Sequence, residues 1–77
     1  MTLKAPGNYI IQNLSDWELI IAYGACNNII ELNTEDAIDE FKNLRDTYHG
    51  GDDHETMKSL ENVKLMYMQE YQKRHGN

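Results

Sequence analysis

The sequence has little cysteine, little proline and few basic residues. Its single cysteine, Cys26, excludes a disulfide bond within the chain and is more typical of a protein from a reducing compartment. We therefore expect a cytoplasmic protein in which Cys26 is a small buried residue. The flanking residues Ala25 and Asn27 supply no base or cation that would activate its thiol.

Basic residues are outnumbered by acidic ones, with seven Lys and Arg against 13 Asp and Glu, which gives a net charge of −6. Binding to a phosphate backbone depends on clustered Lys and Arg, and only Lys73 and Arg74 are adjacent here. We therefore expect no direct nucleic-acid partner. An acidic surface favours solubility, and it also suits a basic protein partner or mimicry of nucleic acid.

Long hydrophobic runs are missing as well. The longest run, Leu19 to Cys26, falls well short of the roughly 20 apolar residues that a membrane span requires, so we expect no membrane partner. The N-terminal residues do not resemble a secretory signal, because they lack an apolar core. Residues 1–7, which end in Pro6-Gly7, are expected to form a flexible tail before a single helical domain over residues 8–77.

Residues 8–32 contain the first periodic segment. Apolar residues recur there in steps of three and four, which predicts a helix with these residues on one side: Ile10, Leu14, Trp17 and Ile21. We expect Trp17 to anchor this helix in the core. The alternative is a set of strands, because the stretches NYIIQ, WELIIAY and NIIEL are rich in Ile and Tyr.

The boundaries of this helix are indicated by capping residues. Ser15 and Glu18 match the capping-box pattern, so the helix begins either at Asn8 or, in better agreement with that pattern, at Ser15. We expect it to end near Gly24 or the Asn27-Asn28 pair, which are common helix stops.

A second helix is predicted from Asn33 or Thr34, as the capping residue, to the Gly50-Gly51 pair. One side of it is apolar and comprises Ala37, Ile38, Phe41, Leu44 and Tyr48. The opposite side is polar and comprises Asp36, Asp39, Asn43 and Asp46. This separation indicates an amphipathic helix that packs on a core.

A third helix is predicted from Asp52 or Asp53 to Gly76, about 22 residues or roughly 33 Å long. Its expected core stripe comprises Met57, Leu60, Val63, Tyr67, Met68 and Tyr71. The other two helices are shorter, so its C-terminal half is expected to project beyond them. The fold class is therefore predicted to be all-α, a small antiparallel three-helix domain with a long C-terminal helix. The alternative is α+β, with a short N-terminal antiparallel sheet followed by two helices.

Two sets of residues are candidates for binding a protein partner. The first lies on the C-terminal helix, where Leu65 and Met66 fall off the core stripe and Met and Tyr suit an adaptable interface: Leu65, Met66, Tyr67 and Tyr71. The second lies in the acidic stretch from Glu31 to Glu40, which suits docking on a basic surface: Glu35, Asp36, Asp39 and Glu40.

A metal site at His49, Asp52, Asp53 and His54 is a weaker hypothesis. Imidazole and carboxylate groups bind zinc, but the HExxH pattern is missing and each residue also has a place in a helix–turn–helix connection. We expect no cofactor and no catalytic residue. The sequence thus favours a small, acidic, non-enzymatic interaction module or regulator, with self-association through the C-terminal helix as one form. The alternatives are an acidic inhibitor or nucleic-acid mimic, and a metal-binding protein at His49–His54.

Overall fold

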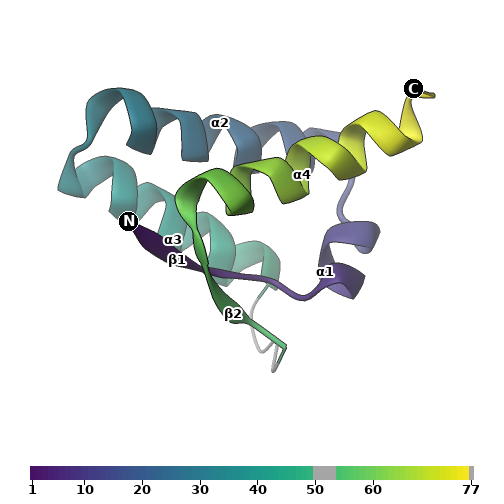
Figure 1. Ribbon diagram of the computed structural model, residues 1–77, viewed down its shortest axis with the longest axis horizontal. Coiled ribbons are helices and arrows are strands. Elements are labelled where there is room, and N and C mark those ends of the chain that lie inside the picture. Colours follow the sequence, from purple (N-terminus) through teal and green to yellow (C-terminus); the bar gives the residue numbers. More distant parts are fainter. Residues whose placement is uncertain (50–53, 77) are drawn as a thin grey trace.

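The computed structural model describes residues 1–49 and 54–76, which form four helices and two short strands. In chain order these are β1 (Thr2–Ala5), α1 (Asn8–Asn13), α2 (Asp16–Leu32), α3 (Glu35–His49), β2 (Thr56–Ser59) and α4 (Leu60–Arg74). The predicted all-α three-helix domain is confirmed only in its mostly helical character, because the described residues form four helices and a two-stranded antiparallel sheet (Figure 1). The sheet does not come from residues 8–32, which are helical, so the α+β alternative placed its strands wrongly.

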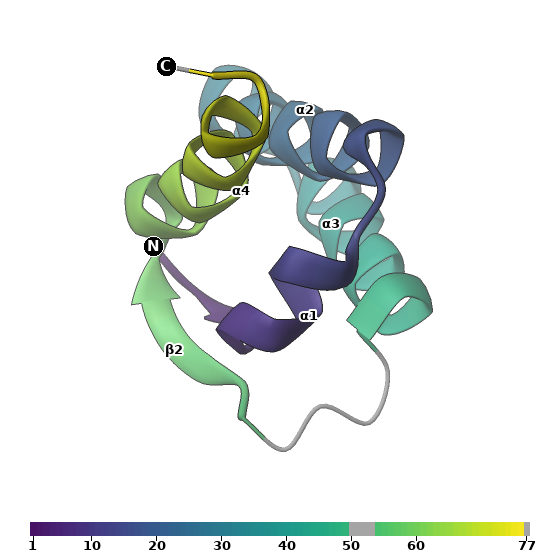
Figure 2. The same cartoon turned by 90° about the vertical axis from the view of Figure 1, so that its right-hand side faces the viewer.

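Helix α2 packs against both α3 and α4. Figure 2 shows α2 and α4 side by side, with α1 and β2 beneath them. The buried residues of α2 are Leu19, Ala22, Ala25, Cys26 and Ile29. Three of these five side chains are small, which lets neighbouring helices approach closely while apolar surface leaves water.

The start of α2 confirms the predicted capping box. The Ser15 side chain accepts a hydrogen bond from the Glu18 backbone N–H at 3.1 Å, and the Glu18 carboxylate accepts one from the Ser15 N–H at 2.8 Å. The predicted end near Gly24 or Asn27-Asn28 is wrong. Packing on both sides carries the helix through these residues to Asn33, whose left-handed backbone (φ 49°) ends it.

The face predicted for α3 is confirmed. Ala37 and Phe41 are buried, while Ile38, Leu44 and Tyr48 are partly buried against the same core. At the N-terminus of this helix, the Thr34 hydroxyl accepts a hydrogen bond from the Ala37 N–H at 3.2 Å, as capping by Thr34 predicts. The predicted stop at Gly50-Gly51 lies outside the described residues.

Residues 2–5 form strand β1 instead of the flexible tail expected over residues 1–7. The strand pairs antiparallel with β2, in a register that sets Thr2 opposite Ser59 and Ala5 opposite Thr56. Leu3 and Ala5 point into the core, with 5% and 0% of their surfaces exposed. The alternate residues of the strand, Thr2 and Lys4, face outward. Alternation with a period of two places these apolar side chains on one face of the strand.

Helix α4 is shorter than predicted, because residues 56–59 form β2. Ser59 caps the helix by accepting a hydrogen bond from the Asn62 N–H at 3.3 Å. The three long helices have 17, 15 and 15 residues, and Tyr71 and Arg74 in the C-terminal half of α4 lie against α2, so the prediction that this half projects beyond the other helices is wrong. Met57 lies in β2 with 60% of its surface exposed and is not part of the core stripe. The predicted caps Asp52 and Asp53 lie outside the described residues.

The hydrophobic core draws its side chains from β1 and the four helices, and its largest fully buried side chains include Tyr67, Phe41 and Leu19. Trp17 is not among them. It is 69% exposed, so the prediction that it anchors the core is wrong. The reason is the helical period: Leu19 and Ala22 turn toward the core, and Trp17 consequently projects from another side of α2.

A test of β1 compares two neighbouring residues. Leu3→Ala should lower the free energy of unfolding by about 2–4 kcal/mol, because it removes a buried side chain and leaves a cavity. Lys4→Ala, at an exposed position of the same strand, should change it by less than about 0.5 kcal/mol. Urea denaturation followed by circular dichroism measures both values. Equal and small effects would contradict the placement of β1 in the fold.

Candidate functional site

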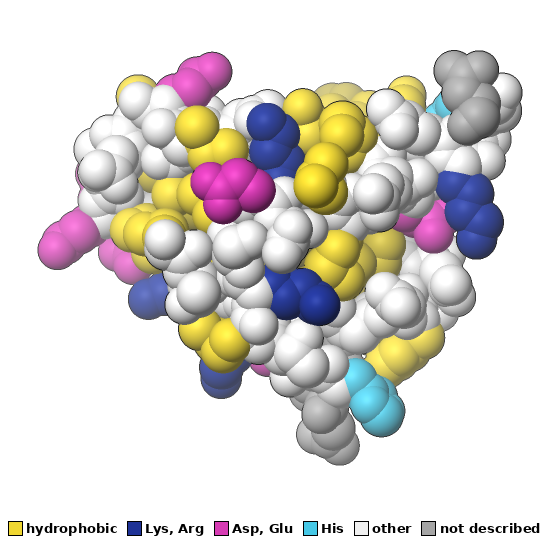
Figure 3. Space-filling model, viewed as in Figure 1, with side chains coloured by type: hydrophobic (Ala, Val, Ile, Leu, Met, Phe, Trp, Pro, Cys, Tyr) yellow, Lys and Arg dark blue, Asp and Glu magenta, His cyan; other side chains and the backbone are white. Residues whose placement is uncertain are grey.

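An apolar groove of about 400 Å³ runs between α2 and α4. Helix α2 contributes Leu19, Ile20 and Tyr23, and α4 contributes Tyr67, Met68, Tyr71 and Gln72. Among the described residues, none that lines this α2–α4 groove is charged. Figure 3 shows hydrophobic side chains gathered where α4 meets α2, on either side of a Lys side chain. A concave apolar surface with aromatic and methionine side chains is suited to holding an apolar part of a partner.

A ridge of exposed apolar side chains borders the groove. Trp17 and Ile20 are 69% and 45% exposed and lie three residues apart on α2, so they are neighbours on the helix surface. Ile20 also lines the groove itself. The Trp17–Ile20 ridge and the groove are therefore one continuous surface, which we call the α2–α4 face.

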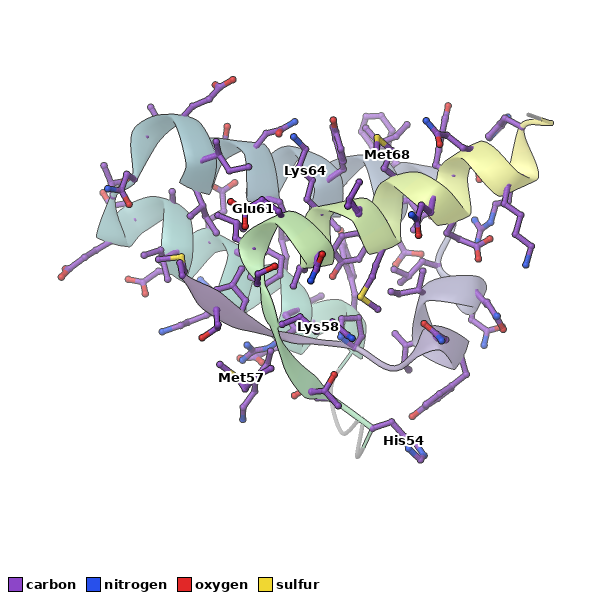
Figure 4. The ribbon with its side chains drawn as sticks, in the orientation of Figure 1. His54, Met57, Lys58, Glu61, Lys64 and Met68 are labelled. Carbon is purple, nitrogen blue, oxygen red and sulfur yellow. The ribbon has the colours of Figure 1, made fainter. Side chains whose placement is uncertain are left out.

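Lys64 marks the edge of this face. Its Nζ lies over the Tyr23 ring, 5.3 Å from the ring centroid, in a cation–π arrangement. Figure 4 shows Lys64 and Met68 projecting from α4 on the side that faces α2, with Glu61 one turn before Lys64. The aliphatic stem of Lys64 thus covers apolar surface while its charge remains at the rim.

Gly24 lies on α2 four residues after Ile20, so the two share one side of the helix. Apart from its chain neighbours and the nearby backbone of α2 itself, the described chain places no heavy atom within 4 Å of a Cβ atom built on Gly24. Glycine within a helix costs about 0.5–1 kcal/mol relative to alanine. The packing of the described chain supplies no reason for this cost, and Gly24 leaves an open position beside the ridge.

The C-terminus of α4 is held against α1 and α2 by Arg74. Its guanidinium group donates hydrogen bonds to the Asp16 carboxylate at 3.1 Å and to the Glu70 carboxylate at 3.0 Å. It also donates to the backbone carbonyls of Gln12 at 2.9 Å and Ile11 at 3.3 Å. These carbonyls belong to the last turn of α1, where the Ile11 carbonyl also accepts a hydrogen bond from the Leu14 N–H at 3.2 Å. Arg74 therefore caps one helix while it joins two others.

His75 completes this cluster beside the groove. Its Nε2 donates to Asp16 Oδ2 at 2.9 Å, and its ring packs against the Tyr71 ring with centroids 4.3 Å apart. The hydrogen bond from Arg74 lowers the pKa of Asp16 below its ordinary value of 3.8. Partial burial of the carboxylate raises this pKa, but the hydrogen bond from His75 lowers it further, so the net shift is downward. The charge at this end of the face is therefore compensated within the fold.

The lowered pKa of Asp16 predicts how stability depends on acid. The stabilising contribution of ionised Asp16 is complete above pH 3.8 and is lost as the pH falls through the lowered pKa of the folded state. Asp16→Asn should therefore reduce the loss of unfolding free energy between pH 5 and pH 2. Asp39→Asn, on the exposed side of α3, should retain the wild-type loss. Urea denaturation at a series of pH values measures this, and identical profiles for wild type and Asp16→Asn would contradict it.

Two other ionisable groups lie beneath the groove. Burial raises the pKa of the Cys26 thiol to about 12, although the charge of Lys64 opposes this. Burial also raises the pKa of the Tyr67 hydroxyl. Both groups are consequently protonated near neutral pH, and the prediction that Cys26 is a small buried residue is confirmed.

The burial of Cys26 has a direct chemical consequence. At pH 8 the folded protein should react with a thiol reagent such as dithionitrobenzoate at least tenfold more slowly than the urea-unfolded protein, because the thiol is fully buried and stays protonated. The absorbance of the thiolate that the reagent releases gives the reaction rates of the folded and the unfolded protein. Equal rates in the two states would contradict the position of Cys26 in the core.

The candidate residues on α4 meet different surroundings. Leu65 is 38% exposed, as predicted, and Tyr71 lines the groove. Tyr67 is almost completely buried and supplies the groove floor. Met66 is partly buried against the core, on the flank of α4 that faces α1, although it was predicted to fall off the core stripe. The α2–α4 face also includes Trp17, a residue that the sequence analysis assigned to the core.

The acidic candidates lie on the exposed side of α3, as predicted: Glu35, Asp36, Asp39 and Glu40. Three of them also border a second groove of about 390 Å³, on the α3 side of α2, in which Ile21 and Leu44 supply apolar surface. The two grooves consequently lie on different sides of α2. One is uncharged and the other is acidic.

The hypothetical metal ligands are largely outside the described structure, because Asp52 and Asp53 and the side chain of His49 are not described. His54 is exposed, and its ring meets the Tyr9 ring edge-on with centroids 5.6 Å apart. Over residues 1–49 and 54–76, no group of three or more His, Cys, Asp or Glu is placed to hold a metal ion. Metal binding at His49–His54 stays an untested hypothesis.

Comparison of the chain with protein-family models, curated proteins and solved structures finds no match. Within the described parts of the chain, no helix has both the length and the apolar character needed to cross a membrane. The class defined by the fold is therefore a small, mostly helical protein with a short antiparallel sheet. Its functional interpretation depends on the two grooves.

Proposed function

We propose that this protein is a small, non-enzymatic interaction module or regulator that binds a protein partner through its α2–α4 face. The observation that carries this proposal is the uncharged groove bordered by the exposed side chains of Trp17 and Ile20. Contiguous apolar surface of this kind marks interaction sites on small proteins.

The composition of the face supports a protein partner. Tryptophan and tyrosine contribute a disproportionate part of the binding energy of protein interfaces, and methionine adapts to the shape of what it contacts. Trp17 leaves 69% of its surface in water, although a protein of 77 residues has little apolar surface to spare for its core. Its position is better explained by a contact outside the chain than by the packing of the fold.

The ionisable groups of the described residues support a non-enzymatic role. The groups whose pKa is raised at the groove, Cys26 and Tyr67, are buried and protonated, so they supply neither a nucleophile nor a base at neutral pH. Asp16 is committed to the ion pair with Arg74, which joins helices. Each of these shifts thus has a structural cause.

The acidic groove beside α3 supports a second candidate, an acidic inhibitor or nucleic-acid mimic that docks on a basic protein surface. Asp36, Asp39 and Glu40 border a hollow with apolar surface from Ile21 and Leu44. Charge complementarity of this kind guides association and makes it sensitive to salt.

Affinity capture with matched variants tests both candidates. Wild-type protein, immobilised and incubated with an extract of its native host, should retain a protein partner that Ile20→Glu loses by at least tenfold. Ile30→Glu should retain it, because Ile30 has the same 45% exposure on the same helix but does not line the groove. Mass spectrometry identifies and quantifies the partner.

The salt dependence of that capture separates the two surfaces. Binding through the uncharged groove should change little between 50 mM and 500 mM NaCl, because little charge is neutralised in the contact. If the captured partner does not bind the Asp39→Lys variant, and if 500 mM NaCl releases it from the wild-type protein, the acidic groove is the binding site instead. A partner retained equally by all three variants would contradict both candidates.

A further inference from the structure

We infer that the partner of the α2–α4 face is a second copy of this chain, with the Trp17–Ile20 ridge of each copy seated in the groove of the other. This inference rests on the proposed function and names its partner. It extends the expectation of self-association through the C-terminal helix, because the whole ridge and three of the seven residues that line the groove come from α2.

The shape of the face supports a symmetric pair. In a two-fold dimer the same patch serves both copies, so any residue that fills a hollow in the partner must have a hollow next to it on its own surface. The α2–α4 face has this property. Ile20 projects from α2 with 45% exposure, and it also lines the groove that an Ile20 from another copy would enter.

The distribution of charge also favours a second copy. The chain carries a net charge of −6, so two copies repel one another unless their acidic surfaces stay apart. The acidic groove lies on the α3 side of α2, and the residues that line the α2–α4 groove are uncharged. Pairing through the α2–α4 face therefore keeps Asp36, Asp39 and Glu40 away from the contact. A basic partner, by contrast, would gain nothing from charge at this groove.

Gly24 provides an independent observation. The described chain leaves the space over its Cα empty, so the absence of a side chain there has no use within one copy. In a pair of copies, the missing Cβ lets the backbone of α2 approach the ridge of the partner closely. The cost of glycine in the middle of α2 is then offset by a contact between chains.

The area that a stable dimer requires is a modest part of the surface of this protein. A standard interface takes about 800 Å² from each partner, which is about one sixth of the 4852 Å² of accessible surface of this protein. The face extends along both α2 and α4, which have 17 and 15 residues. Trp17 alone, of which 69% is exposed, supplies on the order of 150 Å².

Sedimentation velocity of the full chain from about 1 µM to 500 µM tests this inference. Wild-type protein should pass from a 9.0 kDa monomer to twice that mass within this range. Ile20→Glu should raise the dissociation constant of the dimer at least tenfold, because it places a charge in the uncharged groove of the partner. Ile30→Glu should leave it within twofold of wild type. Circular dichroism of the three proteins at low concentration confirms that each is folded.

Gly24→Ala is a second variant whose two effects go in opposite directions. It should raise the melting temperature of the dilute monomer, because alanine favours the helix and has room for its Cβ. It should also weaken the dimer at least fivefold, because the added Cβ keeps the partner at a distance. A rise in melting temperature with unchanged dimerisation would show that Gly24 lies outside the contact and would overturn this part of the inference.

The remaining outcomes separate this inference from the proposed function. A strict monomer at 500 µM overturns the inference, and so does a dimer that Ile20→Glu and Ile30→Glu weaken equally. If the protein fails either of these tests but still captures another protein, and Ile20→Glu abolishes that capture, the proposed function stands and the α2–α4 groove binds a different partner. If it forms no dimer and captures no partner through Ile20, both are wrong.

Discussion

Helix α2 has to bury apolar side chains on two sides at once, and the rest of the structure depends on this constraint. It packs against α3 and α4 together, with Ala22, Ala25 and Cys26 allowing both neighbours to come close. The entropy lost on ordering a chain of 77 residues leaves little margin, so these contacts are central to stability. With two sides occupied, the outer side of α2 is left for Ile20 and Gly24.

The sequence predicted those parts of the fold that local interactions determine. The capping box of Ser15 and Glu18 and the apolar stripe of α3 are signals within a single helix, and the structure contains both. The strands β1 and β2 were missed, because each has four residues and each is defined by pairing with the other, from Thr2 to Ser59. Alternation over so few residues carries little information until the partner strand is known.

The residues predicted to bind a partner through the C-terminal helix coincide only in part with the α2–α4 groove. Tyr71 lines the α2–α4 groove and Leu65 is exposed on α4, whereas Met66 faces α1. Helix α2 is apolar on most sides, so its sequence does not distinguish a buried side chain from an exposed one such as Trp17. The acidic side of α3 was predictable, because a helix that is apolar on one side only has a clear orientation.

The pairing of β1 with β2 and the hydrogen bonds of Arg74 to the carbonyls of α1 join early segments of the chain to late ones. During synthesis, β1 and α1 leave the ribosome well before either partner has been made. Leu3 and Ile11 therefore remain without most of their core contacts until α4 has emerged, and the α2–α4 groove cannot form before then. The α2–α4 groove and the completed fold consequently arise in the same late step of biogenesis, so an unfinished chain does not present this groove.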